Sequence, residues 1–349
     1  MTRPALTALG AAALFGISTP LAKRLTGEIH PVMLAGLLYA GSGVGLAALL
    51  AGRRFLRARP GASITWPQRA ELGWLTAAIL VGGIVGPVLL MFGLGRIPAS
   101  SASLLLNAEA ILSALFAWFI FREHFDAHIA AGMALIVAGG IALAWPGSTA
   151  STSSGALLIV GACACWALDN NLTRKVAAGD ATAIACLKGL AAGGVNLGLA
   201  VALGQVWPAY THIAAAAAIG FLGYGVSLAL FVVALRGLGA GRTGAYFSVA
   251  PFIGAAFAVL LDGDPLTAQL VLAGALMAIG VWLHLSERHD HLHAHPELTH
   301  EHAHVHDLHH RHSHGGQWDG REPHAHRHVH APLTHRHPHF PDIHHQHEH

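Results

Sequence analysis

An internal repeat constrains the fold of this chain more than any other feature of its sequence. Residues 95–99 (GRIPA) correspond to residues 236–240 (RGLGA), and Gly139 corresponds to Gly280, each 141 positions later. Each copy reads as a turn of small residues, a long apolar segment, a short acidic loop and a second apolar segment. A repeat of this kind predicts one structural unit that is used twice.

A second correspondence lies upstream, at an offset of 151. Gly10 matches Gly161, and the basic residues 23–24 match 174–175. Residues 1–288 are dominated by Ala, Leu, Gly, Val and Ile, which is the composition of a membrane protein. The N-terminal apolar run has a repeat partner deep in the chain, so we expect a retained first helix rather than a cleaved signal peptide.

The apolar segments are long enough to cross a bilayer, which takes about 20 residues per helix. We place ten spans at residues 4–25, 31–51, 70–92, 99–121, 127–145, 154–175, 181–203, 213–235, 242–261 and 266–286. The sequence therefore predicts an all-α polytopic membrane protein with a first repeat over 4–145, a flexible linker over 146–153, a second repeat over 154–286 and a tail over 287–349.

The positive charges predict how the spans are oriented. Loops on the N-terminal side of the predicted bundle hold eleven Lys and Arg residues, whereas the opposite loops hold only Lys23, Arg24 and Arg96. Both termini are therefore expected in the cytoplasm, with the chain in the inner membrane. Five helices is an odd number, so the second repeat is expected to be inverted relative to the first. Inverted repeats are typical of secondary transporters.

Several short stretches stand out along residues 4–286. They are residues 14–16 with Lys23, residues 166–175, the turns at 96–99 and 239–242, and the acidic loops at Glu123 and Asp264. On this ordered set the chain resembles the drug/metabolite transporter superfamily in its EamA-type, ten-helix form. The resemblance implies an inner-membrane carrier of small organic solutes, usually an exporter, with a central cavity between its halves. It fixes no substrate.

Two charges lie deep in the predicted spans. Glu109 is near the middle of the fourth span, where a carboxylate costs about 2.5–3.5 kcal/mol on insertion scales. It either lines the pathway and couples transport to protons, or holds two helices together. Lys188 in the seventh span could pair with Glu109 or Asp169, or could contact an anionic substrate.

Further polar residues of the spans are candidates for the substrate pathway. These are Asn107, Trp166, Asp169, Asn170 and Asn196. Asp169 and Asn170 are expected near the cytoplasmic surface, where a helix cap or a gate is favoured over a central site. The cysteines at 163, 165 and 186 lie in apolar stretches, which favours packing over zinc binding.

Two prolines interrupt predicted spans. Pro87 follows Gly86 in the third span, and Pro251 lies in the ninth. A proline inside a helix removes a backbone donor and frees a carbonyl. Both positions are therefore predicted kinks or hinges.

The tail after residue 288 contains 23 of the 28 histidines in the chain. Its His-x-His alternation has no helical apolar face and cannot build a core, so we expect it to be disordered. Neutral imidazole binds zinc, nickel, cobalt and copper. The expected ligands are His291, His293, His295, His302, His304, His306, His324, His326, His328 and His330.

The favoured function is that of a secondary transporter that exports small organic metabolites or drugs. The alternative is efflux of divalent transition metals, with the tail collecting ions. A membrane sensor or scaffold is a third class, and the inverted repeat counts against it. We expect no enzymatic activity, no required cofactor and no nucleic-acid partner. The expected partners are lipid and a small solute, and a homodimer is left open.

Overall fold

The computed structural model describes residues 3–56, 71–121, 127–144, 150–173, 176, 180–238, 240–286, 292–295, 298–304, 324–330 and 333–336. The chain divides into two units, which are considered separately. The helical unit spans Met1–Arg53 and Trp66–Glu287, and the second unit spans Arg54–Thr65 and Arg288–His349.

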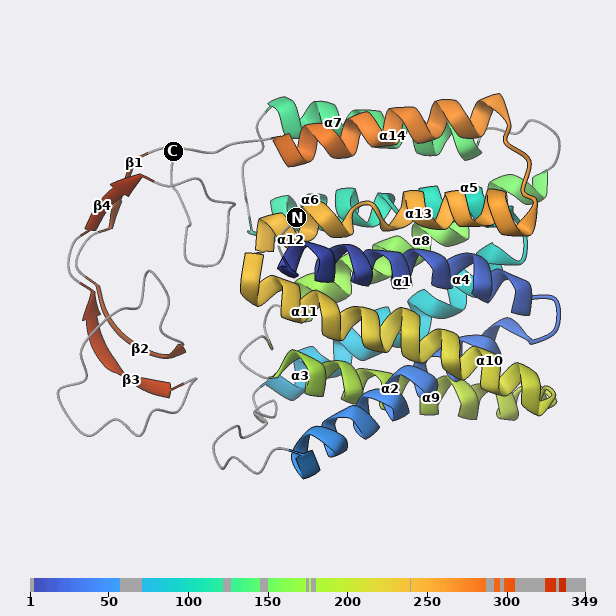
Figure 1. Cartoon of the computed structure of the whole chain (residues 1–349), viewed down its shortest axis with the longest axis horizontal. Helices are drawn as coiled ribbons and strands as arrows, with labels where there is room; N and C mark the ends of the chain where they lie inside the picture. Colours follow the sequence, from blue (N-terminus) through green and yellow to red (C-terminus); the bar gives the residue numbers. More distant parts are fainter. Residues whose placement is uncertain are drawn as a thin grey trace. The chain divides into compact units, whose positions relative to one another are not determined.

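The helical unit holds two successive sets of helices (Figure 1). The first set comprises α1 (Arg3–Leu25), α2 (Pro31–Leu56), α3 (Leu72–Ala78), the π-helical segment η2 (Ile79–Val85), α4 (Gly86–Leu94), α5 (Ala99–Leu105), α6 (Ala108–Phe121) and α7 (Ala127–Ala144). The second comprises α8 (Ala150–Thr173), α9 (Ala181–Ala202), α10 (Tyr210–Gly220), the π-helical segment η4 (Phe221–Val226), α11 (Ser227–Leu238), α12 (Ala240–Phe247), α13 (Ala250–Phe257), the π-helical segment η5 (Ala258–Asp262) and α14 (Ala268–Ser286).

Six stretches among the described residues have the length and composition to cross a membrane. They are Arg3–Leu25, Pro31–Gly52, Leu72–Leu94, Ser154–Thr173, Thr182–Ala202 and Tyr210–Ala234, and three shorter apolar helices cover Ala130–Leu143, Ala250–Asp262 and Ala268–Leu283. Large apolar side chains such as Leu157, Leu260 and Trp282 are exposed on the outside of the helices, as lipid contact would require. The chain is therefore a polytopic helical membrane protein, and the ten-span inverted arrangement stays a prediction.

Two of the predicted continuous spans are broken in the structure. The fourth span breaks at residues 106–107 between α5 and α6, and the ninth breaks at residues 248–249 between α12 and α13. At the first break the Asn107 side chain donates to Leu104 O at 2.9 Å, a local bond that competes with the helical pattern. At the second, Pro251 follows within two residues and has no N–H to give.

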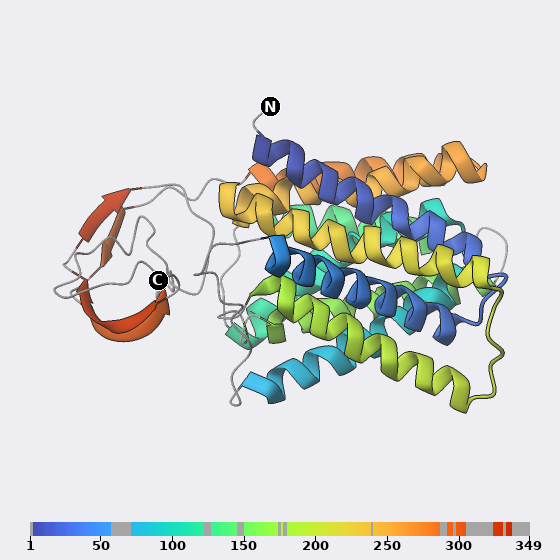
Figure 2. The ribbon, with the colours of Figure 1, turned by 60° about the horizontal axis from the view of Figure 1, so that its bottom comes forward.

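Contacts between the two sets recur at repeat-related positions. α7 packs against α14, and Figure 2 shows α1 next to α11. A Cβ atom added to Gly139 would lie 3.0 Å from Ala273 O, and one added to Gly280 would lie 2.6 Å from Gly132 O. Because residues 132 and 139 precede 273 and 280 by the repeat offset, the same close contact is made twice with the two copies exchanged.

The helices α2 and α9 approach each other in the same reciprocal way. A Cβ atom on Gly43 would lie 2.5 Å from Leu190 N, and one on Gly193 would lie 2.5 Å from Ala40 N. Glycine at these positions lets the two backbones come together without a side chain between them.

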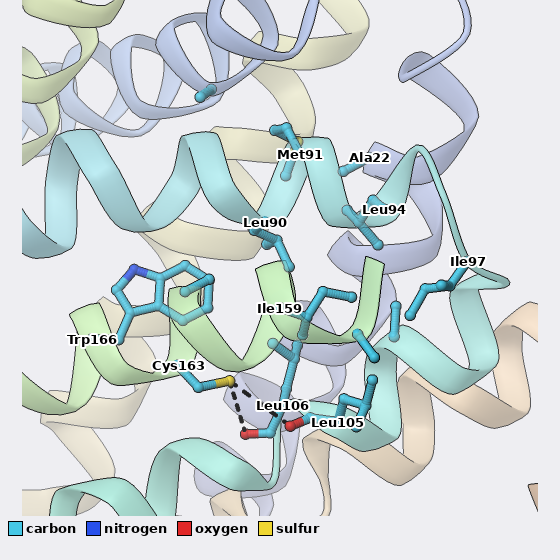
Figure 3. Close-up of a cluster of buried hydrophobic side chains, with 14 of the residues drawn as sticks. Ala22, Leu90, Met91, Leu94, Ile97, Leu105, Leu106, Ile159, Cys163 and Trp166 are labelled. Carbon is cyan, nitrogen blue, oxygen red and sulfur yellow. Dashed lines mark hydrogen bonds between the residues drawn. The ribbon is translucent and has the colours of Figure 1, made fainter. Parts of the chain in front are cut away.

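Apolar side chains fill the space between α4, α8 and the α5–α6 break (Figure 3). Leu90 of α4 points toward Ile159 of α8, whereas Met91 points to the other side of α4, and both belong to one buried cluster with Leu94 and Trp166. The thiol of Cys163 is buried in this cluster and donates to Leu105 O at 3.8 Å. Cys163 therefore packs as a small apolar group whose S–H finds a carbonyl of the broken span.

The second unit contains four short strands. β1 (Leu292–His295) pairs antiparallel with β4 (Leu333–Arg336), and β2 (Leu298–His304) pairs antiparallel with β3 (His324–His330). The prediction of disorder throughout the tail is corrected for these residues. The His-x-His alternation that excludes an amphipathic helix has a period of two, which is the period of a β-strand.

Candidate functional site

The third predicted span changes from α to π geometry immediately before Pro87. The N–H of Gly86 bonds to Val81 O, five residues back, and Pro87 has no N–H to continue the ladder. The carbonyls of Gly82 and Gly83 thereby lose the donor that a proline-free helix would provide. This leaves two backbone acceptors in the interior of a membrane helix.

Side chains from three other helices bond to those carbonyls. Gly82 O accepts from Trp166 Nε1 of α8 at 2.9 Å and from Tyr39 OH of α2 at 3.1 Å. Gly83 O accepts from Asn196 Nδ2 of α9 at 3.3 Å. Such buried carbonyls would be costly without donors. The break at Pro87 is thus the point to which α2, α8 and α9 are tied.

Asp169 of α8 packs directly on this break. A Cβ atom on Gly82 would lie 2.2 Å from Asp169 Oδ2, so only glycine leaves room for the carboxylate. The repeat-related Gly223 makes the same contact with Ser18 of α1, since its Cβ atom would lie 2.3 Å from Ser18 Cβ. The acid in the second repeat therefore occupies the position that a serine has in the first.

Asp169 is fully engaged by neighbouring donors. Lys188 Nζ of α9 lies 2.5 Å from Asp169 Oδ1 and 2.7 Å from Asp169 Oδ2. Thr173 Oγ1, one turn along α8, donates to Asp169 Oδ1 at 2.9 Å and lies 3.3 Å from Lys188 Nζ. Both charged side chains are largely buried, 9% and 17% exposed for Asp169 and Lys188. Of the two carboxylates proposed from sequence as partners of Lys188, Asp169 is the one in contact with it.

Glu109 stands in a different environment. It lies in the first turn of α6, just after the break at residues 106–107. Asn170 Nδ2 of α8 donates to Glu109 Oε1 at 2.9 Å. Within the described part of the chain, Glu109 forms no ion pair. Because Asn170 follows Asp169 directly, the paired and the unpaired carboxylate are both held by the same short piece of α8.

Asn107 and Asn196 have other roles. Asn107 uses its amide to hold its own helix end and to contact Met277 Sδ at 3.8 Å. Asn196 is completely buried, and its Oδ1 has no hydrogen-bond partner among the described residues. The Asn107 amide therefore stabilises the end of its own helix. Asn196, in contrast, retains an unpaired buried acceptor among the described residues, beside the break at Pro87.

Sequence reasoning missed three members of this group: Tyr39, Gly82 and Thr173. Thr173 carried a usable signal, because it lies four residues after Asp169 and so on the same face of a helix. Gly82 carried a partial signal, because its spacing from Gly86 predicts a close approach of two helices, but nothing in the sequence identifies Asp169 as the neighbour. Tyr39 carried none, since its relation to Trp166 depends on the packing of three helices. Pro251, the other predicted kink, lies in the first turn of α13, directly after the break at residues 248–249.

The histidines expected to bind metal lie in the second unit. His293 and His295 are on β1, His302 and His304 on β2, and His324, His326, His328 and His330 on β3. His291 and His306 lie outside the described residues. Across the side chains that the structure describes, no group of three or more His, Cys, Asp or Glu is placed to hold a metal ion.

Comparisons with known proteins match the helical unit. The family model of the EamA-like transporter family matches residues 2–145 and again residues 153–286. A protein of Methanothermobacter thermautotrophicus described as an uncharacterized transporter is 27% identical over 290 residues, covering 80% of this chain and 84% of the relative. A solved crystal structure is similar in fold, with a TM-score of 0.59 at 19% identity, over 81% of this chain and 96% of the other.

Proposed function

Because the chain belongs to the EamA-like transporter family, we propose that it is a secondary transporter that exports small organic metabolites or drugs across the inner membrane. Two inverted repeats would rock against each other and expose a site between them to each side in turn. The reciprocal contacts of Gly139 with Ala273 and of Gly280 with Gly132 support this arrangement. Each of these contacts joins the two repeats at equivalent positions.

Glu109 is the residue on which we place coupling. Of the two carboxylates Glu109 and Asp169, Glu109 accepts from a neutral amide, whereas Asp169 is paired with a cation. An ionised carboxylate at this depth is costly, so binding of a proton or of a positively charged group on the solute would be favoured there. This asymmetry is the single observation that carries the proposal.

The test is transport by protein in proteoliposomes. A growth and uptake screen of a deletion strain across amino acids, nucleosides, drugs and metals would first identify a transported solute. We expect Glu109→Gln to reduce its transport more than tenfold while leaving the yield of monodisperse protein unchanged. Glu28→Gln, at an exposed carboxylate between α1 and α2, is the matched control and should transport normally. Parallel loss of folded protein and of transport would assign Glu109 a purely structural role.

The proposed orientation has both termini in the cytoplasm. It depends on eleven Lys and Arg residues in the loops of one side against three on the other. Reporters fused after Ser286 and within residues 62–66 should both give a cytoplasmic signal. A periplasmic signal from either would contradict the ten-span arrangement.

Metal efflux is the alternative function, and the 23 histidines of the tail favour it. A chain ending at Arg288 keeps the helical unit and separates the two functions. If the protein exports organic solutes, the truncated chain should keep their transport and lose most zinc or nickel binding. Unchanged resistance to zinc, nickel, cobalt and copper in both truncated and deletion strains would contradict metal efflux.

A further inference from the structure

Charged residues join the two sets of helices at the end of the unit where α1 finishes. Arg24, at the C-terminal end of α1, donates from Nε to Asp262 Oδ1, the last residue of η5. Its Nη2 also donates to Leu261 O at 3.0 Å. Asp262 and Leu261 lie 238 and 237 positions after Arg24 in the sequence, so the contact links the first set of helices to the second.

A second contact fastens the same segment to another helix of the first set. Asp264 Oδ2 accepts from the backbone N–H of Ser100, in the first turn of α5, at 2.8 Å. Gly263 between the two acids adopts a left-handed conformation with φ of 70°, which glycine tolerates without strain. The turn lets two acids so close in sequence bind two different helices.

We propose that Arg24, Asp262, Asp264 and the Ser100 N–H form a charged latch that closes this end of the transporter and opens during each transport cycle. The inference rests on the proposed alternating access, in which the two repeats must separate at one end at a time. Contacts between the repeats at this end must then break when it opens. By the positive-inside prediction this is the outer end.

The strength of the latch suits a contact that breaks repeatedly. The Arg24 side chain is 53% exposed, and that of Asp262 is 14% exposed. Because the Arg24 side of the pair is open to solvent, the pair contributes less than a fully buried one and is weakened by salt. The buried Asp169–Lys188 pair lies within the second set and joins α8 to α9. The Asp169–Lys188 pair is therefore a permanent contact inside one repeat, and the Arg24–Asp262 pair is a breakable contact between the repeats.

Ser103 provides a reporter beside the latch. It lies one turn beyond Ser100 on α5, is 1% exposed, and its Oγ has no partner among the described residues. It packs against α13 of the second set, because a Cβ atom on Gly254 would lie 2.8 Å from Ser103 Oγ. Separation of the repeats at this end would uncover it.

The experiment measures the reaction of a hydrophilic maleimide with Ser103→Cys in nanodiscs, after replacement of Cys163, Cys165 and Cys186 by Ala. We expect Arg24→Gln and Asp262→Asn each to raise the labelling rate about two- to fivefold, the range set by an exposed ion pair. The charge exchange Arg24→Asp with Asp262→Arg should restore slow labelling.

Arg96→Gln is the control, since Arg96 is an exposed cation at the same end. It should leave labelling unchanged. High salt should speed labelling of the protein with an intact latch and leave Arg24→Gln unaffected. Unchanged labelling in monodisperse Arg24→Gln and Asp262→Asn, or an equal rise in Arg96→Gln, would overturn the latch. Labelling requires no substrate, so this result is independent of whether a solute is transported.

Discussion

Asp169 and Glu109 are two carboxylates in the membrane helices that the fold treats in opposite ways. Asp169 receives a cation and a hydroxyl, from Lys188 and Thr173. Glu109 receives one amide N–H, from Asn170. The difference shows how a membrane protein can separate two uses of a buried acid. A fully bonded acid fixes the helices, while an acid without a cation keeps a charge that a proton or solute can neutralise.

The largest effect should come from breaking the paired acid. Lys188→Met leaves Asp169 as an uncompensated charge among buried groups, and we expect the free energy of unfolding to fall by about 3–5 kcal/mol. This loss is measured by thermal unfolding of detergent-purified protein, with the remaining folded fraction monitored by size-exclusion chromatography.

The double variant Lys188→Met with Asp169→Asn is the control for that experiment. It removes both charges together, so most of the lost stability should return. If the double variant were no more stable than Lys188→Met alone, the two residues would not act as a structural pair.

Much of the helical unit follows from the sequence, because runs of apolar residues and the breaks between them set where helices can lie. The interruptions inside spans follow less well. The break at residues 106–107 lies 142 positions before the break at 248–249, within one position of the repeat offset, yet only the second has a neighbouring proline, Pro251. Equivalent breaks with and without proline indicate that packing between helices, rather than proline alone, places them.

The sequence predicted the charged members of the candidate site, but not which of them pair. Glu109, Asp169 and Lys188 stood out as charges among apolar residues, which sequence alone reveals. The choice of Asp169 over Glu109 as the partner of Lys188 depends on how α8 and α9 pack, and no spacing encodes it. The strands of the second unit were not predicted for another reason. The period-two alternation of histidines was used only to exclude an amphipathic helix, although the same period is that of a β-strand.

A smaller effect should follow from the hydroxyl that completes the paired acid. Thr173→Val keeps the shape of the side chain and removes a donor to Asp169, while Lys188 remains in place. We expect a loss of about 1.5–3 kcal/mol, the range for one hydrogen bond to a charged group. The measurement is thermal unfolding in the same detergent, with Thr7→Val in α1 as control, since Thr7 bonds only to Arg3 O at an exposed position. An equal loss in both variants would mean that the hydroxyl does not support Asp169.

The neutral donor of the unpaired acid should matter less still. Asn170→Ala removes the bond to Glu109, but the side chain of Asn170 is exposed. A single bond from a neutral, exposed donor contributes little, so we expect a stability change of about 0.5–1 kcal/mol. A loss as large as that of Lys188→Met would show that Glu109 depends on Asn170 as strongly as Asp169 depends on Lys188, and would remove the contrast between the two acids.

The smallest change in stability should come from Glu109→Gln. The Gln side chain has nearly the same shape, its Oε1 can accept the same bond from Asn170, and among the described residues no cation loses a partner. We expect the free energy of unfolding to change by less than about 0.5 kcal/mol, because a neutral amide is also less costly in the membrane than a carboxylate. Asp169→Asn, measured beside it, should be much more destabilising, since it strands Lys188. Equal destabilisation by the two variants would mean that Glu109 has a hidden structural role, and its assignment to coupling would then fail even if its transport were lost.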